Sequence, residues 1–386
     1  MIKIVHISPV FHDNWSYQEN ILTNIQSYEK DFEVLVISSK TSIVNYESPI
    51  NLNEDYFLNK VRIIRLNFIF NFFNRFYLFK NLYKTLDSIK PDIIMIHGLQ
   101  TLSVLQVISY KKKNSHCRIY ADLHADYDIS GKNIFSILIL HKLIWKSLIS
   151  YSIKYLEQIY YTRPSVKKFS MDLYSINDIK LSPLYLGTEF NLPTEEERFE
   201  IRSKFRKSLQ IDNNDFVIIT GGKLSEISNI ETIIHAMNNQ DFTYNIHLII
   251  FGSIDDKYLD YLRGLILDKN NLQFLGWQNK RQIFEALVSS DLSIYLGRHS
   301  VLWEQSIGLG LPIVLKYKID REYLNCNNNV HFLFSNETIE LINALKQFLN
   351  TESYYKYILS NSRDAGPENF NFINITKKLN EIWKKY

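Results

Sequence analysis

The sequence predicts an α/β protein with two domains, each built on a doubly wound parallel sheet. Its 386 residues exceed what one ordinary hydrophobic core accommodates, so about two domains are expected. Short apolar runs of strand length alternate with helical patterns along both halves, which is typical of parallel sheets covered by helices. Most of these runs end at glycine or polar residues. Ligands bind at such strand ends in this fold class.

The composition is that of an ordinary globular protein, with 46% hydrophobic and 22% charged residues. A net charge of +3 and the lack of a recognised basic module argue against nucleic acid as a partner. Cys117 and Cys326 form no CxxC pair, so we expect no disulfide framework and a reducing, cytoplasmic location. No apolar stretch reaches membrane-spanning length.

The first half is expected to contain seven strands, at residues 2–8, 32–38, 61–66, 91–97, 118–124, 158–162 and 180–186. A helix should begin after the first strand, with Ser16 as N-cap and Glu19 completing a capping box. Polar residues cluster at the expected strand ends and mark a candidate binding edge: Ser8, His97, Asp122, His124, Asp126, Arg163 and Glu189.

The segment Asp122-Leu-His-Ala-Asp126 places three ionisable side chains at the end of a predicted strand. One histidine between two carboxylates does not match a zinc pattern. A lone histidine is often structural, but the position at the sheet edge favours a binding role for His124.

Two segments of the first half are basic, aromatic and free of acidic residues. Residues 60–84 carry six Lys or Arg and eight aromatic residues, and residues 129–156 combine Trp145 with several lysines. Such segments can form amphipathic helices that lie on an anionic membrane. The alternative is core helices whose lysines extend toward water.

The second half repeats the α/β plan after a charged run at residues 192–207, which is interpreted as the connection between domains. Strands are expected at residues 216–220, 245–251, 272–275, 291–295 and 313–315, and helices at 230–237, 282–289 and 372–385. The strand at 216–220 runs into Gly221, Gly222 and Lys223, an arrangement suited to phosphate. Neither the G-x-x-x-x-G-K-[ST] nor the G-x-G-x-x-G spacing occurs.

The stretch from Tyr295 to Lys316 reads as strand end, loop, helix over 301–307, turn and strand. A loop that enters a helix presents free backbone N–H groups and a positive dipole end to phosphate. Glu304 lies one turn into this helix and could accept hydrogen bonds from ribose hydroxyls. The alternative is an ordinary exposed glutamate of a βαβ unit.

Taken in order, these motifs resemble those of GT-B glycosyltransferases, most closely the retaining family 4 and its capsular-polysaccharide and O-antigen members. The motifs are HISP (6–9), SYQEN (16–20), PDIIMIHG (91–98), ADLHADY (121–127), LGTE (186–189), GGKL (221–224), FLGW (274–277) and HSVLWEQSIGLGLP (299–312). The resemblance covers nearly the whole chain. It implies two Rossmann-like domains facing a central cleft: an acceptor-side domain at 1–191, a nucleotide-sugar domain at 192–370, and a helix at 371–386 that crosses back.

The resemblance also assigns roles to individual residues. Lys223 matches the residue that contacts the donor diphosphate, Glu304 the one that binds its ribose, and His124 the one that faces its sugar; these three are the expected catalytic residues. The remaining expected donor-side residues are Gly222, Ser253, Trp277, Arg298, His299, Ser300, Val301 and Leu302. On the acceptor side the expected residues are Tyr17, Asp122 and Asp126.

Two departures from the family pattern bear on activity. The first glutamate of the family's pair falls at Leu296, and the second basic residue of its phosphate clamp falls at Ser228. Arg298 and His299 are nearby in the sequence and could replace the missing glutamate, whereas half of the phosphate clamp is absent. A non-catalytic partner subunit and a sugar-nucleotide epimerase of the same fold therefore remain alternative interpretations.

The implied reaction moves a sugar from a nucleoside-diphosphate sugar, with UDP favoured over GDP, to a glycan or lipid-linked oligosaccharide. The resemblance places it in bacterial surface polysaccharide synthesis, with retention at the anomeric carbon and with neither a metal nor a cofactor. The protein would work in the cytoplasm, in peripheral contact with an anionic membrane at its inner face.

Overall fold

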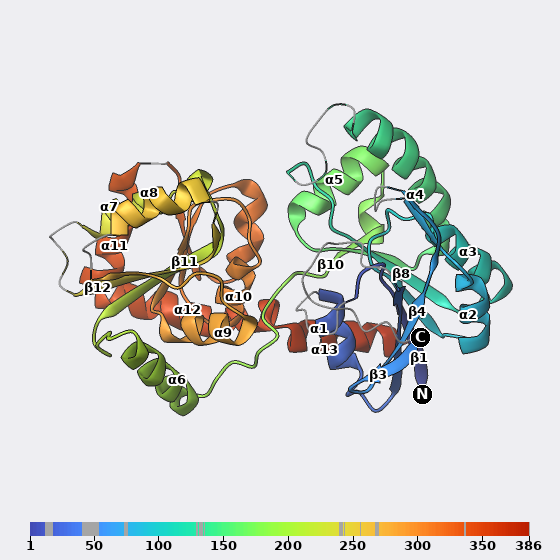
Figure 1. Ribbon diagram of the computed structural model, residues 1–386, viewed down its shortest axis with the longest axis horizontal. Coiled ribbons are helices and arrows are strands. Elements are labelled where there is room, and N and C mark those ends of the chain that lie inside the picture. Colours follow the sequence, from blue (N-terminus) through green and yellow to red (C-terminus); the bar gives the residue numbers. More distant parts are fainter. Residues whose placement is uncertain are drawn as a thin grey trace. The chain divides into compact units, whose positions relative to one another are not determined.

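The computed structural model describes residues 1–11, 18–40, 54–72, 76–128, 136–238, 244–254, 256–266, 270–335 and 337–385, with residues 130, 134 and 242. The chain forms two domains (Figure 1), one of residues 1–185 with 376–386 and one of residues 186–375. Each domain is a parallel sheet flanked by helices, so the predicted pair of Rossmann-like domains is confirmed. The first boundary follows Tyr185 rather than residue 191, and the chain returns to the first domain at Thr376 rather than at residue 371.

The first domain contains an eight-stranded sheet in the order β10-β9-β8-β7-β1-β2-β4-β3. Its neighbouring strands are parallel except for β3 against β4. The strand order reverses between β1 and β7, which is where a ligand site is expected in a doubly wound sheet. All seven predicted strands are present, and the sheet consists of β1 (Ile2–Ile7), β2 (Phe32–Ser39), β3 (Asp55–Leu58), β4 (Val61–Leu66), β7 (Ile93–Ile96), β8 (Arg118–Leu123), β9 (Gln158–Tyr161) and β10 (Leu181–Pro183).

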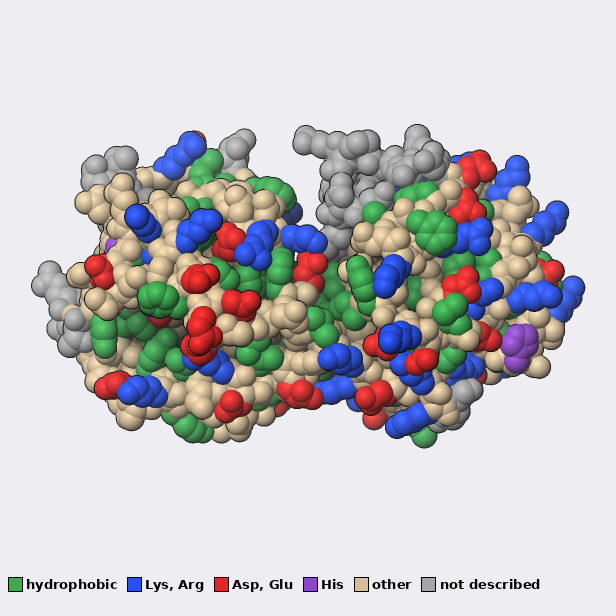
Figure 2. All heavy atoms as spheres, turned by 90° about the horizontal axis from the view of Figure 1, so that it is seen from below, with side chains coloured by type: hydrophobic (Ala, Val, Ile, Leu, Met, Phe, Trp, Pro, Cys, Tyr) green, Lys and Arg blue, Asp and Glu red, His purple; other side chains and the backbone are tan. Residues whose placement is uncertain are grey.

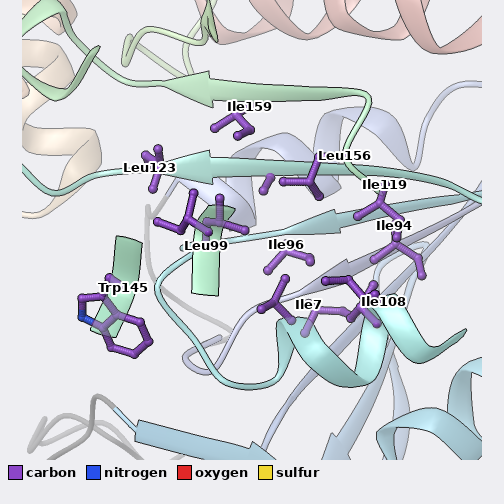
Figure 3. Close-up of a cluster of buried hydrophobic side chains, with 14 of the residues drawn as sticks. Ile7, Ile94, Ile96, Leu99, Ile108, Ile119, Leu123, Trp145, Leu156 and Ile159 are labelled. Carbon is purple, nitrogen blue, oxygen red and sulfur yellow. The ribbon is translucent and has the colours of Figure 1, made fainter. Parts of the chain in front are cut away.

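Helices and buried apolar side chains complete the first domain. Its helices are α1 (Gln18–Gln26), α2 (Leu82–Ile89), α3 (Val104–Lys113), the π-helix η1 (Ser136–Trp145), α4 (Lys146–Ser152), the short η2 (Ile153–Tyr155) and η3 (Asp178–Lys180), and α5 (Pro164–Tyr174). Figure 3 shows the core, in which Ile94, Ile96 and Ile119 from β7 and β8 lie near Ile108 of α3. The purely apolar strands are buried on both faces, as expected for a parallel sheet.

The prediction of an amphipathic helix within residues 60–84 is wrong for most of that segment. After β4 the chain forms an antiparallel hairpin of β5 (Phe68–Phe72) and β6 (Phe76–Phe79). Phenylalanine, tyrosine and isoleucine favour extended backbone over helix. Burial alternates along β6, where Tyr77 and Phe79 join the core, as a period of two requires.

The second domain contains six strands in the order β13-β12-β11-β14-β15-β16. All pairs are parallel, and the order reverses between β11 and β14, as in dinucleotide-binding folds. The strands are β11 (Phe216–Leu224), β12 (Ile246–Ile254), β13 (Leu272–Phe274), β14 (Leu292–Tyr295), β15 (Ile313–Lys316) and β16 (Val330–Leu333). The helices are α6 (Glu195–Ser208), η4 (Glu226–Ser228), α7 (Ile230–Met237), α8 (Asp256–Ile266), α9 (Lys280–Ser289), α10 (Leu302–Gly308), η5 (Ile319–Leu324), α11 (Thr338–Asn350) and α12 (Glu352–Phe370).

The charged run interpreted as a domain connection is instead helix α6 of the second domain. Thr194 and Glu197 form a capping box, and three glutamates occupy the first turn, where they complement the helix dipole. Buried Arg206 anchors the helix through Asp291, at 2.6 Å. The run is charged because it is an exposed helix, not because it is a linker.

The last helix, α13 (Phe372–Lys384), ends in the first domain. Its Trp383 is fully buried there and stacks on Tyr120 of β8. On the face shown in Figure 2, lysine and arginine side chains are interspersed with acidic ones, in keeping with the small net charge. No helix in the described part of the chain is both long and apolar enough to cross a membrane.

Candidate functional site

The switch point of the second sheet is built around two glycines. The predicted turn at Gly221-Gly222-Lys223 is a continuation of β11, which pairs with β12 as far as Leu224 and Ile254. Gly222 and Gly252 have φ values of +116° and +129°, which side-chain-bearing residues rarely adopt. A Cβ at Gly252 would lie 1.9 Å from the carbonyl oxygen of Gly222. The two strands can therefore approach this closely only because position 252 is glycine.

The same glycines bring the end of β11 to the start of α10. A Cβ on Gly222 would lie 3.3 Å from Ser300 Oγ and 3.4 Å from Leu302 Cδ1. Lys223 is next along the strand and is in register with Ser253 of β12. The Lys223 side chain is exposed and forms no ion pair or hydrogen bond with another described residue. Its ammonium group is therefore available to an anion.

The loop between β14 and α10 is held by Arg321, a residue that the sequence analysis missed. The buried Arg321 guanidinium donates to the carbonyls of Gly297, at 3.1 Å, and Lys316, at 2.6 Å. It also lies 4.6 Å from the ring centroid of Trp303, a cation–π geometry. Arg298 and Val301 of the loop are exposed.

Glu304 is fully buried, so the alternative of an ordinary exposed glutamate is wrong. Its Oε1 accepts hydrogen bonds from His299 Nε2, at 2.7 Å, and from the hydroxyl of Tyr323, at 2.6 Å. Its Oε2 has no partner among the described residues. Burial raises the pKa of Glu304, but His299 and Tyr323 outweigh it, and the net direction is downward. The site therefore holds an ionised carboxylate with one unfilled acceptor oxygen, whereas buried polar groups are normally satisfied.

Helix α10 is fixed in place by close packing against α12. A Cβ at Gly308 would lie 2.2 Å from the carbonyl oxygen of Phe370, and one at Gly366 would lie 2.1 Å from that of Ile307. Because both contacts are to backbone, a side chain at either position would force the two helices apart. This packing sets the position of Glu304.

The remaining donor-side residues lie at the ends of neighbouring strands. Trp277 is 74% exposed and follows Gly276, whose carbonyl accepts from the Gly252 N–H at 2.8 Å. By contrast, Leu296 belongs to the hydrophobic core, and Ser228 Oγ accepts from Ser225 N to cap η4. The two positions that depart from the family pattern thus provide no charge to the site.

In the first domain, a buried chain of hydrogen bonds crosses the carboxyl ends of β1, β7 and β8. Asp122 Oδ2 lies 2.6 Å from His97 Nδ1, and Asp122 Oδ1 lies 3.0 Å from His124 Nε2. His97 Nε2 lies 3.0 Å from His6 Nδ1, and His6 Nε2 lies 2.8 Å from Gln26 Oε1. Gln26 Nε2 in turn donates to Asn380 Oδ1 of α13, at 3.0 Å.

The hydrogen-bond partners indicate which atoms carry protons. An amide oxygen only accepts, so His6 donates from Nε2 to Gln26. Burial, followed by the charge of His97, lowers the pKa of His6 to about 3, so its ring is neutral and Nδ1 accepts. Burial raises the pKa of Asp122, but the charges of His124 and His97 outweigh this effect and lower it. A carboxylate only accepts, so His97 donates from Nδ1 to Asp122.

The predicted segment Asp122 to Asp126 separates into different environments. The His124 side chain is 44% exposed; partial burial lowers its pKa, but Asp122 raises it by more. Asp126 is instead buried, pairs with Arg163 Nη2 at 2.7 Å and accepts from Ser165 Oγ at 3.1 Å. Of the expected acceptor-side residues, Asp122 orients His124, Asp126 is engaged within the domain, and Tyr17 lies outside the described residues.

Sequence reasoning missed Tyr323. It also missed the three residues that extend the hydrogen-bond chain beyond His97, namely His6, Gln26 and Asn380. No local motif signals a contact between Gln26 and Asn380, which are 354 positions apart. The pair Asp126 and Asp128 has Asp-x-Asp spacing, but the carboxylate of Asp126 faces Arg163. Within the described ranges, no three His, Cys, Asp or Glu residues are grouped so as to hold a metal ion.

Comparisons with known proteins find similarity to glycosyltransferases. Residues 201–364 match the family Glycosyl transferases group 1. An uncharacterised glycosyltransferase of Methanocaldococcus jannaschii is 21% identical over 239 residues, a match that covers 59% of this chain and 60% of the relative. The chain thus spans less than two thirds of the length of this relative.

Solved structures show the same fold over the whole chain. Anabaena HepE, in complex with UDP and glucose, matches with a TM-score of 0.65 and 14% identity, covering all of both chains. A UDP-GlcNAc 2-epimerase from Neisseria meningitidis, bound to UDP-GlcNAc, matches with a TM-score of 0.59 and 13% identity, again over all of both chains. The chain therefore has the GT-B fold, and its second domain carries a glycosyl transferases group 1 match.

Proposed function

We propose that the protein is a glycosyltransferase that binds a nucleoside-diphosphate sugar, with UDP favoured as the nucleotide, in its second domain. The observation that carries the proposal is the unfilled Oε2 of buried Glu304. Glu304 lies on α10, and the first turn of this helix borders Gly222. The exposed Lys223, with its ammonium group, is the next residue along β11. The family match to residues 201–364 covers this site.

The proposed donor pose pairs each of these groups with one part of the ligand. A ribose hydroxyl donates to Glu304 Oε2, which supplies the missing hydrogen bond. Lys223 and Arg298 meet the diphosphate and stabilise the negative charge that develops when the sugar–phosphate bond breaks. Trp277 offers an exposed aromatic face to the base. Because two cations are present, this pose assigns the charge stabilisation to side chains and includes no metal.

In the first domain, we propose that His124 meets the transferred sugar. Asp122 holds its Nε2 at 3.0 Å, which fixes the ring plane and favours a protonated imidazole near neutral pH, since the pKa of His124 is raised. The sequence resemblance to retaining family 4 supports retention at the anomeric carbon. It also supports a glycan or lipid-linked oligosaccharide acceptor in bacterial surface polysaccharide synthesis.

Two alternatives make different predictions. The fold is shared with a UDP-GlcNAc 2-epimerase, and fold alone does not determine chemistry. A non-catalytic partner subunit is favoured by Leu296 and Ser228, which give the site no charge. Glu304 argues against that alternative, because an ionised carboxylate with an unfilled oxygen is costly to bury unless a ligand uses it.

Proton NMR of sugar nucleotides incubated with the protein separates the three functions. A transferase releases UDP and yields a new anomeric signal, whose coupling constant reports retention or inversion. An epimerase instead converts one UDP-sugar into another without release of UDP. If UDP binds and no UDP-sugar changes over long incubation with candidate acceptors, the protein is a binding subunit and the transferase proposal fails.

A lipid-linked acceptor is favoured by an apolar surface on the first domain, formed by β5 and η1. The hairpin partner of β5, strand β6, meets η1 where Phe76 and Trp145 stack, with ring centroids 5.0 Å apart. The exposed apolar side chains of this surface are Ile69, Phe70 and Phe72 of β5, Leu138, Ile139 and Leu143 of η1, and Ile134, which precedes η1. Residues 60–84 and 129–156 carry lysines and arginines but no acidic residue. We propose that this surface rests on an anionic membrane, at the cytoplasmic face.

Vesicle co-sedimentation tests the membrane proposal. We expect binding to vesicles containing phosphatidylglycerol, weaker binding to pure phosphatidylcholine, and loss of binding in the double variant Phe70→Ser, Phe72→Ser. Phe334→Ser, which removes a phenylalanine of the second domain that is more exposed than either, is the control. Equal sedimentation of wild type and the double variant would rule this surface out.

A further inference from the structure

The second domain contains an arginine-lined pocket that the proposed donor site does not use. It has a volume of about 260 Å³ and lies among α6, α12 and the turns that precede β14 and β15. Asp291 and Gly310, which line it, come just before these two parallel strands. The pocket is therefore at the amino ends of the strands, whereas the candidate donor site is at their carboxyl ends.

Two of the lining arginines carry unsatisfied donors. Arg198 is only 8% exposed; its Nη2 donates to the Leu309 carbonyl at 3.0 Å, and its Nε has no partner among the described residues. No carboxylate of the described chain lies within ion-pair distance of Arg198. Arg363 also has a buried, unpartnered Nε, while its Nη1 pairs with Glu195 at 3.1 Å. Buried guanidinium groups normally have their donors satisfied.

The charges around the pocket do not balance. Arg202 and Arg206 share the single carboxylate of Asp291, at 2.7 and 2.6 Å. Among the described residues, Arg363 forms an ion pair with Glu195 alone, and the Glu195 side chain is 70% exposed. Burial, and then the charge of Arg363, lower the pKa of Arg198 to about 10, which leaves it protonated at neutral pH. Four buried or half-buried cations therefore face two carboxylates, and a bound anion would relieve the excess of positive charge.

We propose that this pocket binds a small phosphate-bearing anion, either inorganic phosphate or a phosphate monoester. Guanidinium groups match phosphate oxygens with paired N–H donors, so the free donors of Arg198 and Arg363 suit a phosphate. The volume is just below the roughly 300–1,000 Å³ of drug-sized ligand pockets, which suits a small anion. The apolar lining of Val288, Tyr355 and Leu359 can accommodate a small non-phosphate moiety. This site is independent of the proposed sugar transfer.

Thermal-shift and calorimetric titrations with inorganic phosphate and with glucose 6-phosphate test the proposal. Sodium chloride at equal ionic strength and unphosphorylated glucose serve as the blanks. We expect saturable stabilisation by at least one phosphate compound, because a ligand that binds only the native state stabilises it. A similar response to both compounds would identify the phosphate group alone as the ligand. A stronger response to glucose 6-phosphate would identify a phosphate monoester.

Variants assign the effect to the pocket. Arg363→Gln, at a half-buried position, should weaken phosphate binding at least tenfold, whereas Arg263→Gln, at an exposed position on α8, should not. Lys223→Ala should leave this binding unchanged, which separates it from phosphate held at the donor site. Arg198→Met should also weaken phosphate binding. A circular dichroism spectrum like that of wild type would show that this variant is folded. Absence of stabilisation beyond the chloride blank, or full binding in Arg363→Gln, would overturn the proposal.

Discussion

The hydroxyl of Tyr323 donates to Glu304 Oε1 across 2.6 Å, from the short helix η5 to helix α10. His299 donates to the same oxygen at 2.7 Å. Because both protein donors use Oε1, the second oxygen is left for another partner. The pair therefore fixes the orientation of a buried carboxylate before any ligand arrives, which is how a preorganised binding group is expected to look.

Tyr323→Phe should destabilise the protein without emptying the site. The change removes one hydrogen bond to a charged group and leaves the ring in place, so we expect a loss of about 1.5–3 kcal/mol in the free energy of unfolding. Urea denaturation measures it. UDP affinity should fall by less than in Glu304→Gln, since Oε2 remains. Unchanged stability would show that His299 alone holds the carboxylate.

Lys223→Ala should reduce UDP affinity with little effect on stability. The side chain is exposed and makes no ion pair within the described chain, so its removal is expected to change the free energy of unfolding by no more than about 0.5 kcal/mol. Lys207→Ala, an exposed lysine of α6, is the matched control and should change neither quantity. If the two variants bound UDP equally well, Lys223 would have no role in donor binding.

Gly252→Ala should be strongly destabilising, because the new Cβ would lie 1.9 Å from the Gly222 carbonyl oxygen and φ is +129°. Backbone strain and overpacking each cost about 1–3 kcal/mol, so the free energy of unfolding should fall by roughly 2–6 kcal/mol. Gly264→Ala, in helix α8 with open space around it, should instead stabilise by about 0.5–1 kcal/mol. A mild effect at Gly252 would contradict the close approach of β11 and β12.

Stability should fall on acidification because of His6. Its unfolded-state pKa is near 6.5, while burial lowers the folded-state pKa to about 3. Between pH 6.5 and 4, the unfolded chain binds a proton at this residue that the native state does not. The free energy of unfolding should therefore decrease by about 1.4 kcal/mol per pH unit from His6 alone. Asp122 adds its own loss only below its unfolded pKa, near 3.8.

Denaturation at several pH values between 4 and 6.5 tests the His6 prediction. The variant His6→Asn should show a shallower dependence on pH than wild type, by about the same 1.4 kcal/mol per pH unit. Parallel curves for the two proteins would mean that His6 is already charged in the folded state. The proton assignment of the histidine chain would then have to be reversed.

The sequence predicted the strands because buried parallel strands are nearly continuous apolar runs, as in residues 2–7 and 93–96. It also marked Gly222, Lys223 and Glu304 as candidate donor-side residues, through the glycine turn at 221–223 and the resemblance of residues 299–312 to a family motif. The structure brings Gly222 beside Ser300 and Leu302. It failed at residues 68–79, where apolar residues alone could not distinguish a hairpin from a helix, and at α6, where charge suggested a linker. Tyr323 and the link between Gln26 and Asn380 depend on tertiary contacts that leave no local pattern.

Isothermal titration calorimetry of UDP tests the central claim, that the second domain holds a nucleoside diphosphate between Glu304 and Lys223. We predict saturable binding to the wild type and affinity at least tenfold weaker in both Glu304→Gln and Lys223→Ala, with Lys207→Ala unchanged. Absence of UDP binding to folded wild type, or equal affinity in all four proteins, would contradict the account.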